Sequence, residues 1–200
     1  MAIWEDRVKF SIAVNMERYD PAQDMRVVAR NALELVQMAE QGGFEIAWAA
    51  EHHGVEMTIA PSPFQILLHW AGQTERIRLG TAVVVAPYWH PLRLAGEAAL
   101  CDVLSDGRLE LGIARGAFQY EFDRMAAGIP GEAGVGYMKE LLPAIKSLWQ
   151  GATTHTTGLI GHSQLRRPCP SRYRIRIRLF GLRRATQAAW TGRSRWALIC

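Results

Sequence analysis

The sequence predicts an α/β fold built on a parallel sheet, and three observations support this prediction. Segments typical of strands and of helices alternate from Lys9 to Gly151. The run from Arg78 to Ala86 is apolar and β-branched, as in a strand buried on both faces. Four strand–helix units follow one another with the pitch of a (β/α)8 TIM barrel, which needs roughly 250 residues to close. We therefore expect a barrel-type fold truncated to about four such units.

Each element is predicted from residue type and spacing. The first helix carries apolar residues at spacings of three and four, with Pro21 at its start and Gly42-Gly43 just past its end. The other elements are bounded by Gly, Pro and Ser in the same way. Strands are expected over residues 9–16, 45–50, 78–86 and 109–114, and helices over residues 21–41, from 61 or 62 to 72, 91–104 and 137–149.

The composition is that of an ordinary globular chain. With 200 residues, 49% hydrophobic and 21% charged, the chain is too apolar for a disordered protein, and three Cys are too few for a disulfide scaffold. No run reaches roughly 18 consecutive apolar residues, so we expect no membrane-spanning helix. Charged residues between Met1 and Lys9 are unlike a secretory signal. We expect a cytoplasmic protein with reduced thiols.

Charge divides the chain into two regions at Gly151. Residues 1–151 hold 13 Lys and Arg against all 19 Asp and Glu, a net charge of −6, whereas residues 152–200 hold 10 Arg and no Lys, Asp or Glu, a net charge of +10. The second region lacks the strand–helix rhythm of the first. We therefore predict a half-barrel domain over 1–151 and a disordered Arg-rich tail over 152–200. Such a basic tail is also a feature of nucleic-acid-binding arms.

Glu51, His52 and His53 come directly after the second predicted strand. In a barrel of this type the carboxyl ends of the strands form the catalytic face, and an imidazole there can transfer protons near neutral pH. Adjacent side chains at a strand end point to opposite sides, which is a poor arrangement for binding one metal ion, so we expect no metal site. At least one of the two His is as readily structural as functional.

Arg115 follows the fourth predicted strand and so belongs to the same face. Its guanidinium can bind a phosphate there, or equally pair with a surface carboxylate. Arg108 precedes that strand and is predicted on the opposite face, which serves stability. Small residues from Gly80 onward let a flat ligand approach the backbone, although a packed core strand has the same pattern. Cys101 falls in the third predicted helix and is expected in the core.

These motifs, taken in order, resemble the bacterial luciferase-like family of flavin-dependent monooxygenases. The resemblance covers about residues 8–151, and it rests on a long collinear set of short matches, each of which is weak alone. Common phosphate-loop, zincin, hydrolase and redox motifs are absent. The matching stretches are Gly42-Gly43-Phe44, Trp48 to His53, Glu75 to Ala82, His90-Pro91-Leu92-Arg93, Asp102 to Ser105, Gly107 to Gly112, and Arg115-Gly116.

The resemblance implies a TIM-like barrel that binds reduced FMN at its carboxyl face and uses O2 to oxidise a small organic substrate. By the same resemblance His52 is the catalytic His beside the flavin. Ala82 and Val83 lie under the flavin ring, joined by a non-prolyl cis peptide that is common in the family, and Arg115 contacts the flavin phosphate. A separate flavin reductase and a homo- or hetero-dimer are implied for the full-length protein. Ala114 stands where luciferases proper carry a reactive Cys, so light emission is not implied.

The family's remaining strands have no counterpart after Gly151, so we expect a truncated and impaired copy of such an enzyme. Codons for the family-like segment Gly-Asp-Tyr-Thr-His-Asp-Gly, read one base later, encode residues 152–158. A frameshift near Gly151 also explains the tail's composition, because out-of-frame GC-rich DNA yields many Arg codons. We therefore interpret residues 152–200 as a non-native peptide.

Two other functions are compatible with the sequence. One is a deazaflavin (F420)-dependent oxidoreductase of the same superfamily, which transfers hydride without O2; the Glu51-His52-His53 pattern favours FMN slightly. The other is nucleic-acid binding, in which the Arg residues of the tail contact phosphates and Tyr173 and Phe180 stack on bases. The second function predicts a salt-sensitive affinity that is lost when residues 152–200 are deleted.

Overall fold

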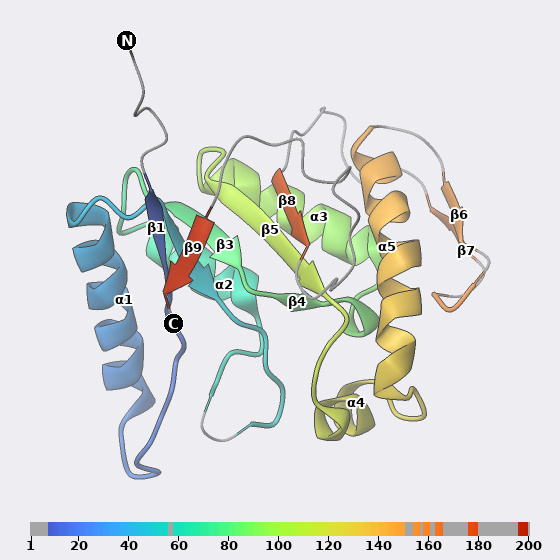
Figure 1. The fold of residues 1–200 in the computed structure, drawn as a ribbon, viewed down its shortest axis with the longest axis horizontal. Helices are drawn as coiled ribbons and strands as arrows, with labels where there is room; N and C mark the ends of the chain where they lie inside the picture. The colour runs from blue at the N-terminus through green and yellow to red at the C-terminus, as the bar shows by residue number, and fades with distance from the viewer. Residues whose placement is uncertain are drawn as a thin grey trace.

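The computed structural model describes residues 8–55, 58–150, 154–156, 158–160, 163–165, 176–179 and 196–199. Its main feature is a parallel sheet covered by helices (Figure 1). The strands are β1 (Lys9–Ala13), β2 (Ile46–Ala49), β3 (Arg78–Thr81), β4 (Val84–Val85) and β5 (Leu109–Ala114), and the helices are α1 (Met25–Gln41), α2 (Pro63–Ala71), α3 (Pro91–Leu104), α4 (Gln119–Met125) and α5 (Gly134–Trp149), with short 3-10 turns at Ala86–Tyr88 and Gly131–Ala133.

The sheet has the order β4-β5-β3-β2-β1-β9, with β8 also paired to β5. Neighbouring strands are parallel, and the registers Ile12↔Ala47, Ala47↔Leu79 and Leu79↔Leu109 place these four side chains in one row. This row packs into the buried core beneath the helices. The fold is therefore the parallel α/β arrangement that the alternation of elements predicts.

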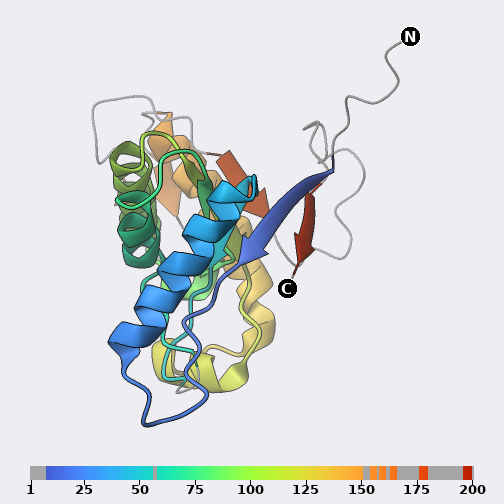
Figure 2. The same ribbon diagram turned by 90° about the vertical axis from the view of Figure 1, so that its left-hand side faces the viewer.

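The helices lie outside the strands. Figure 1 shows α1 beside β1 at one end of the sheet and α5 beside β5 at the other, and the view turned by 90° shows the sheet edge-on with α2 and α3 on one face (Figure 2). The Trp149 indole donates to the Ala95 carbonyl at 3.0 Å, which ties α5 to α3. Cys101 is 1% exposed within this layer, as predicted, and burial raises the pKa of its thiol to about 12.

A second row of residues, on the opposite face of the sheet, contains one close approach. The registers Trp48↔Gly80 and Gly80↔Glu110 place Gly80 between two large side chains. A Cβ at Gly80 would overlap the Trp48 ring, so glycine is required here. Glu110 is fully buried and its carboxylate binds the Arg78 guanidinium, with 2.7 Å between Nε and Oε1.

Several predicted boundaries are wrong: the first strand ends at Ala13 rather than Met16, and the last helix begins at Gly134 rather than Tyr137. Helix α1 begins at Met25 rather than Pro21, because Asp20 folds residues 20–23 into a turn by accepting from the Ala22 amide, and Asp24 then caps the helix by accepting from the Arg26 amide at 2.8 Å. The strand predicted over 78–86 is interrupted after Thr81. There the Thr81 hydroxyl bonds to both the amide and the carbonyl of Gly112 on β5, each at 2.8 Å.

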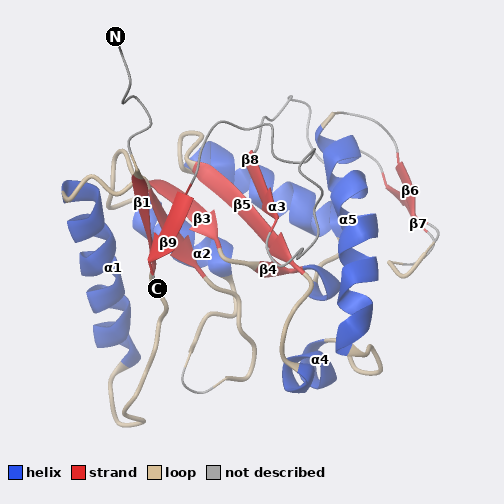
Figure 3. Cartoon of the chain, in the orientation of Figure 1, coloured by secondary structure: helices blue, strands red, loops and turns tan. Residues whose placement is uncertain are grey.

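The carboxyl ends of the strands meet at one edge of the sheet. Figure 3 shows the loops after β1, β2 and β5 leaving at this edge, with α4 beneath them. Helix α4 is absent from the sequence prediction. Since parallel strands bring their carboxyl ends together, the residues after β2, after β3 and after β5 share this edge.

The described parts of residues 152–200 are short strands. Strands β6 (Thr154–Thr156) and β7 (Ser163–Leu165) form an antiparallel pair, while β8 (Arg176–Leu179) pairs with β5 and β9 (Trp196–Ile199) pairs with β1, both in parallel. The disorder predicted for this region, and the side chains on which nucleic-acid binding depends, otherwise fall outside the described residues. Among the described helices, none is long and apolar enough to cross a membrane.

Candidate active site at the carboxyl edge of the sheet

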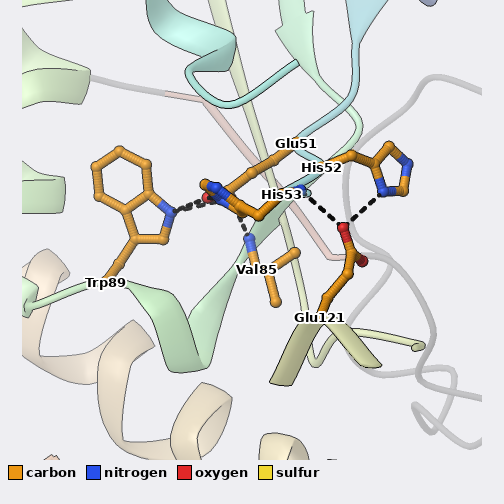
Figure 4. A network of polar contacts seen from close by, with 6 residues as sticks. All are labelled: Glu51, His52, His53, Val85, Trp89 and Glu121. Atoms are coloured by element: carbon orange, nitrogen blue, oxygen red, sulfur yellow. Dashed lines mark hydrogen bonds and ion pairs between the residues drawn. The ribbon is translucent and has the colours of Figure 1, made fainter. Parts of the chain in front are cut away.

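The site is built around the His52–His53 pair, which follows β2. The backbone of His52 is held by its amide, which donates to the Ala60 carbonyl at 2.9 Å and forms an isolated bridge. From this fixed backbone the two rings reach different partners (Figure 4). The His52 side chain is 27% exposed and the His53 side chain 14% exposed, so His52 is the more accessible of the two.

His52 is bound by Glu121, a residue of α4. The Nδ1 atom of His52 lies 3.1 Å from Oε1 of Glu121, and the same oxygen accepts from the His53 amide at 2.8 Å. Glu121 is only 3% exposed. The His52 ring also neighbours the Phe118 ring, in a tilted arrangement with 6.1 Å between ring centroids. The segment after β5, up to the first turn of α4, therefore supplies both the carboxylate and an aromatic neighbour of His52.

His53 is bound by Glu51, a second buried carboxylate. Its Nε2 atom lies 2.8 Å from Oε1 of Glu51, which is 4% exposed. Glu51 also accepts from the Val85 amide at 2.7 Å, and from the Trp89 indole at 3.0 Å and 2.9 Å on its two oxygens. Figure 4 shows Trp89, Val85 and His53 gathered around this one carboxylate. Glu51 thus joins the end of β2 to the segment after β3.

Two aromatic rings pack in series beside His53. The Tyr88 ring meets His53 edge to face at 5.5 Å, and the Phe122 ring meets Tyr88 at the same distance. Burial, together with the nearby carboxylates of Glu121 and Glu51, raises the pKa of the Tyr88 phenol far above its usual value. Tyr88 therefore stays protonated at physiological pH and cannot serve there as a base.

Ala82 and Val83 lie between β3 and β4 and are joined by a cis peptide bond. This is the position at which the resemblance predicts such a bond. Both residues are half-buried, and the Ala82 amide donates to the Ala49 carbonyl at 2.7 Å. Small side chains and partial exposure leave this stretch of backbone open to a flat ligand.

Arg115 follows β5, as predicted, and its side chain is exposed. Within the described part of the chain its guanidinium has no carboxylate partner, so the ion-pair alternative is not seen there. Gly116 comes next with φ +86°, and a Cβ at this position would lie 2.7 Å from the Phe122 ring and 3.0 Å from Val85. The chain therefore turns tightly against the site immediately after Arg115.

The position of Arg108 has a clear outcome. Arg108 lies at the opposite, amino edge, where it bonds to loop carbonyls, as predicted. Within the described residues, no group of three or more His, Cys, Asp or Glu is arranged to bind a metal ion.

The sequence prediction misses the contributions of Glu121, Glu51 and Trp89. Glu121 is 69 positions from His52 in the sequence, and no helix was predicted around it. An acidic residue in the first turn of a short helix is the one local signal available. Glu51 was noted beside the His pair, but nothing in its neighbourhood indicates that it binds Val85 and Trp89.

Comparisons with known proteins agree with this geometry. The profile of the luciferase-like monooxygenase family matches residues 8–174. A curated relative, the oxygenase component of the flavin-dependent trigonelline monooxygenase of Acinetobacter baylyi, is 45% identical over 148 residues, which are 74% of this chain and 41% of that protein. The chain thus spans about two fifths of that relative's length.

Solved structures show the same fold. The monooxygenase RslO1 from Streptomyces bottropensis superimposes with a TM-score of 0.73 at 27% identity, covering 86% of this chain and 52% of that one. The oxygenating constituent of 3,6-diketocamphane monooxygenase from Pseudomonas putida, solved in complex with FMN, has a TM-score of 0.71 at 18% identity and covers 78% and 43% of the two chains.

Proposed function

Because this chain belongs to the luciferase-like monooxygenase family, we propose that its carboxyl edge binds FMN and serves the oxidation of a small organic substrate by O2. The observation that carries the proposal is the meeting of His52, the Ala82–Val83 backbone and Arg115 at one edge of the sheet. This edge is where barrel enzymes place their chemistry. The flavin-dependent relative from Acinetobacter baylyi supports the choice of cofactor class.

The residues at this edge fit a flavin mononucleotide. A flat ring needs a small, accessible surface, which the half-buried Ala82 and Val83 offer. A phosphate needs an accessible cation, and the exposed Arg115, which has no carboxylate partner among the described residues, can supply it. FMN, rather than another flavin, is proposed because the structural neighbour from Pseudomonas putida holds FMN on this same fold.

A reduced flavin supplies the electrons that activate O2, so that one oxygen atom enters the substrate and the other leaves as water. In the proposed enzyme His52 transfers a proton, since its ring is the more accessible of the pair and is held in place by Glu121. Phe118 and Tyr120, which stack at 5.4 Å and are partly exposed beside His52, favour an apolar substrate. Glu51 holds the segment after the cis peptide through Val85.

The proposal includes partners. The relative from Acinetobacter baylyi is named an oxygenase component, so we infer that a separate reductase supplies reduced flavin. We also propose a dimer for the full-length protein and a cytoplasmic location. The F420 alternative lacks comparable support, because the 45% identical relative is named flavin-dependent.

The test is flavin binding and turnover by the full 200-residue chain. FMN binding is measured by flavin fluorescence, and turnover with reduced FMN and O2 against a panel that includes trigonelline and a long-chain aldehyde. His52→Ala should lower turnover by about 100-fold or more, while His53→Ala should have a smaller effect. Equal effects of the two substitutions, or no binding of FMN by the folded chain, would contradict the proposal.

For residues 152–200 we propose a frameshift near Gly151. The absence of Asp, Glu and Lys from this region supports it, while the family match that continues to residue 174 weighs against it. Sequencing the coding DNA across Gly151 decides the matter. A missed or added base would replace residues 152–200 by a continuation of the barrel sequence, whereas a correct reading frame would show that these residues belong to the protein itself.

A further inference from the structure

The two carboxylates beside the His pair are both placed to act as hydrogen-bond acceptors. Oε1 of Glu121 accepts from the His53 amide at 2.8 Å, and Oε2 of Glu51 accepts from the Val85 amide at 2.7 Å. A backbone N–H can only donate, and both carboxylates are almost fully buried. An ionised carboxylate accepts hydrogen bonds and cannot donate them, so any imidazole nitrogen bonded to it must carry a proton.

For His52 the bonded nitrogen is Nδ1, 3.1 Å from Oε1 of Glu121. A neutral imidazole carries one proton, and here Nδ1 needs it for the bond to Glu121. Nε2 of His52 is then unprotonated and carries a lone pair. The His52 side chain is 27% exposed, so this lone pair lies on the more accessible of the two imidazoles.

For His53 the bonded nitrogen is the other one, Nε2, 2.8 Å from Oε1 of Glu51. The same oxygen accepts from the Trp89 indole at 3.0 Å, which is also a donor only. His53 therefore needs its proton on Nε2, and its Nδ1 is left unprotonated. Two adjacent residues of one type thus make the same kind of bond through opposite ring atoms.

We propose that Glu121 and Glu51 hold His52 and His53 in opposite neutral tautomers, with the proton on Nδ1 of His52 and on Nε2 of His53. Glu121 is in this sense a positioning residue for His52. On the proposed function, the arrangement gives His52 an unprotonated Nε2 that can accept a proton from the reacting molecule. His53 also has an unprotonated nitrogen, Nδ1, but its ring is only 14% exposed and packs edge to face against Tyr88, so we assign it no such role.

The tautomers can be measured directly by NMR on the full chain labelled with 15N-histidine. Long-range 1H–15N correlations distinguish a protonated ring nitrogen from an unprotonated one, and they are recorded at the alkaline plateau of each titration, where the rings are neutral. The chain has six His, so His52→Gln and His53→Gln variants assign the two sets of signals. Opposite patterns for His52 and His53 are expected, and the same tautomer in both rings would overturn the proposal.

Substitution of each carboxylate tests its assigned partner. Glu121→Gln removes the obligatory acceptor, because a side-chain amide can also donate, so the His52 signals should move toward a mixture of tautomers while those of His53 stay unchanged. In Glu51→Gln the His53 signals should move toward a mixture of tautomers, while those of His52 stay unchanged. Glu132→Gln, at an exposed glutamate of the same loop region, is the matched control and should alter neither ring. An unchanged His52 pattern in Glu121→Gln would refute the positioning role.

Turnover separates this inference from the proposed function. If the wild-type chain oxidises a substrate, Glu121→Gln should lower kcat by about tenfold or more with little change in KM, and Glu132→Gln should not. A chain that shows opposite tautomers without binding FMN would overturn the proposed function and leave the tautomer assignment standing. A chain that turns over with both rings in one tautomer would overturn the tautomer assignment and leave the proposed function standing.

Discussion

At the amino edge of the sheet, half-buried charged side chains bond to the backbone of loops, whereas at the carboxyl edge buried carboxylates bond to imidazoles as well as to backbone amides. Arg108 donates to the carbonyls of Ala71 and Ser105 at 2.8 Å and 2.9 Å, and to the Thr74 hydroxyl at 2.9 Å. Glu40 accepts on one oxygen from three successive amides, of residues 75, 76 and 77. Glu121 and Glu51 also accept from backbone amides, those of His53 and Val85, but each contacts an imidazole as well.

The difference shows how one sheet separates stability from chemistry. Backbone groups do not titrate, so a charge bound to them can only fix the shape of the loops. An imidazole can gain or lose a proton, so a charge bound to it also controls which atom reacts. We therefore expect substitutions at the amino edge to change the free energy of unfolding most, and substitutions at the carboxyl edge to change binding and turnover most.

The largest effect on stability is expected for Arg108→Ala. The change removes bonds from one guanidinium to the loops before β3 and β5, and it should lower the free energy of unfolding by about 3 kcal/mol. Chemical denaturation measures the loss. Arg76→Ala, at an exposed side chain in the adjacent loop, is the control and should cost less than about 0.5 kcal/mol. Equal losses for the two variants would contradict the stabilising role of Arg108.

Glu51→Ala should have the next largest effect, and it tests how sharply the two edges differ. It leaves the Val85 amide and the Trp89 indole without their acceptor, which should cost about 2 kcal/mol. Glu51→Gln keeps an acceptor and should recover about half of that loss. Both values come from denaturation curves. A cost as large as that of Arg108→Ala would mean that the carboxyl edge contributes to stability as much as the amino edge.

Glu40→Gln should cost about 1 kcal/mol at neutral pH, because the carboxylate is only partly buried. Burial raises the pKa of Glu40, but hydrogen bonds from the amides of Ile77, Arg76 and Glu75 outweigh it, so the pKa lies below its ordinary value of 4.5. The stabilisation is therefore fully present above pH 4.5 and is lost as the pH falls through the lowered pKa. Unfolding measured across this acid range should show the wild type and the variant converging. A difference that persists in strong acid would argue for packing rather than charge.

Arg115→Ala should have the smallest effect on stability, below about 0.5 kcal/mol, because the side chain is exposed. Its effect should appear in ligand binding instead. FMN affinity should fall by about tenfold, whereas the affinity for riboflavin, which lacks the phosphate, should not change. Titration of both ligands by fluorescence checks this. Equal weakening of the two would remove the phosphate role of Arg115.

Elements with strong local signals are predicted well from the sequence. Helix α3 begins at Pro91 and strand β5 spans 109–114, both as predicted, because Pro at a helix start and the turn at Ser105 to Gly107 act through neighbouring residues. The start of α1 is misplaced because Pro21 and Asp24 are both plausible starts, and only the side-chain hydrogen bond of Asp24 distinguishes them.

The sequence predicts where some residues of the site lie, but it does not predict their contacts. The positions of His52 and Arg115 follow from strand order, since residues after parallel strands share an edge. The contacts of Glu121 and Glu51 depend on chain segments that meet only in the folded protein: Glu51 lies 38 positions from Trp89 and Glu121 lies 69 from His52. No local pattern encodes such pairings, so they become visible only in the structure.

Cys101 offers a way to follow the molecule in time. Its thiol is buried at 1% exposure and its pKa is raised to about 12, so the folded chain holds it almost entirely as the unreactive thiol. An alkylating reagent can reach it only when α3 separates from the sheet. The rate of its modification, read residue by residue by mass spectrometry, would therefore report how often this helical layer opens under native conditions, without any denaturant.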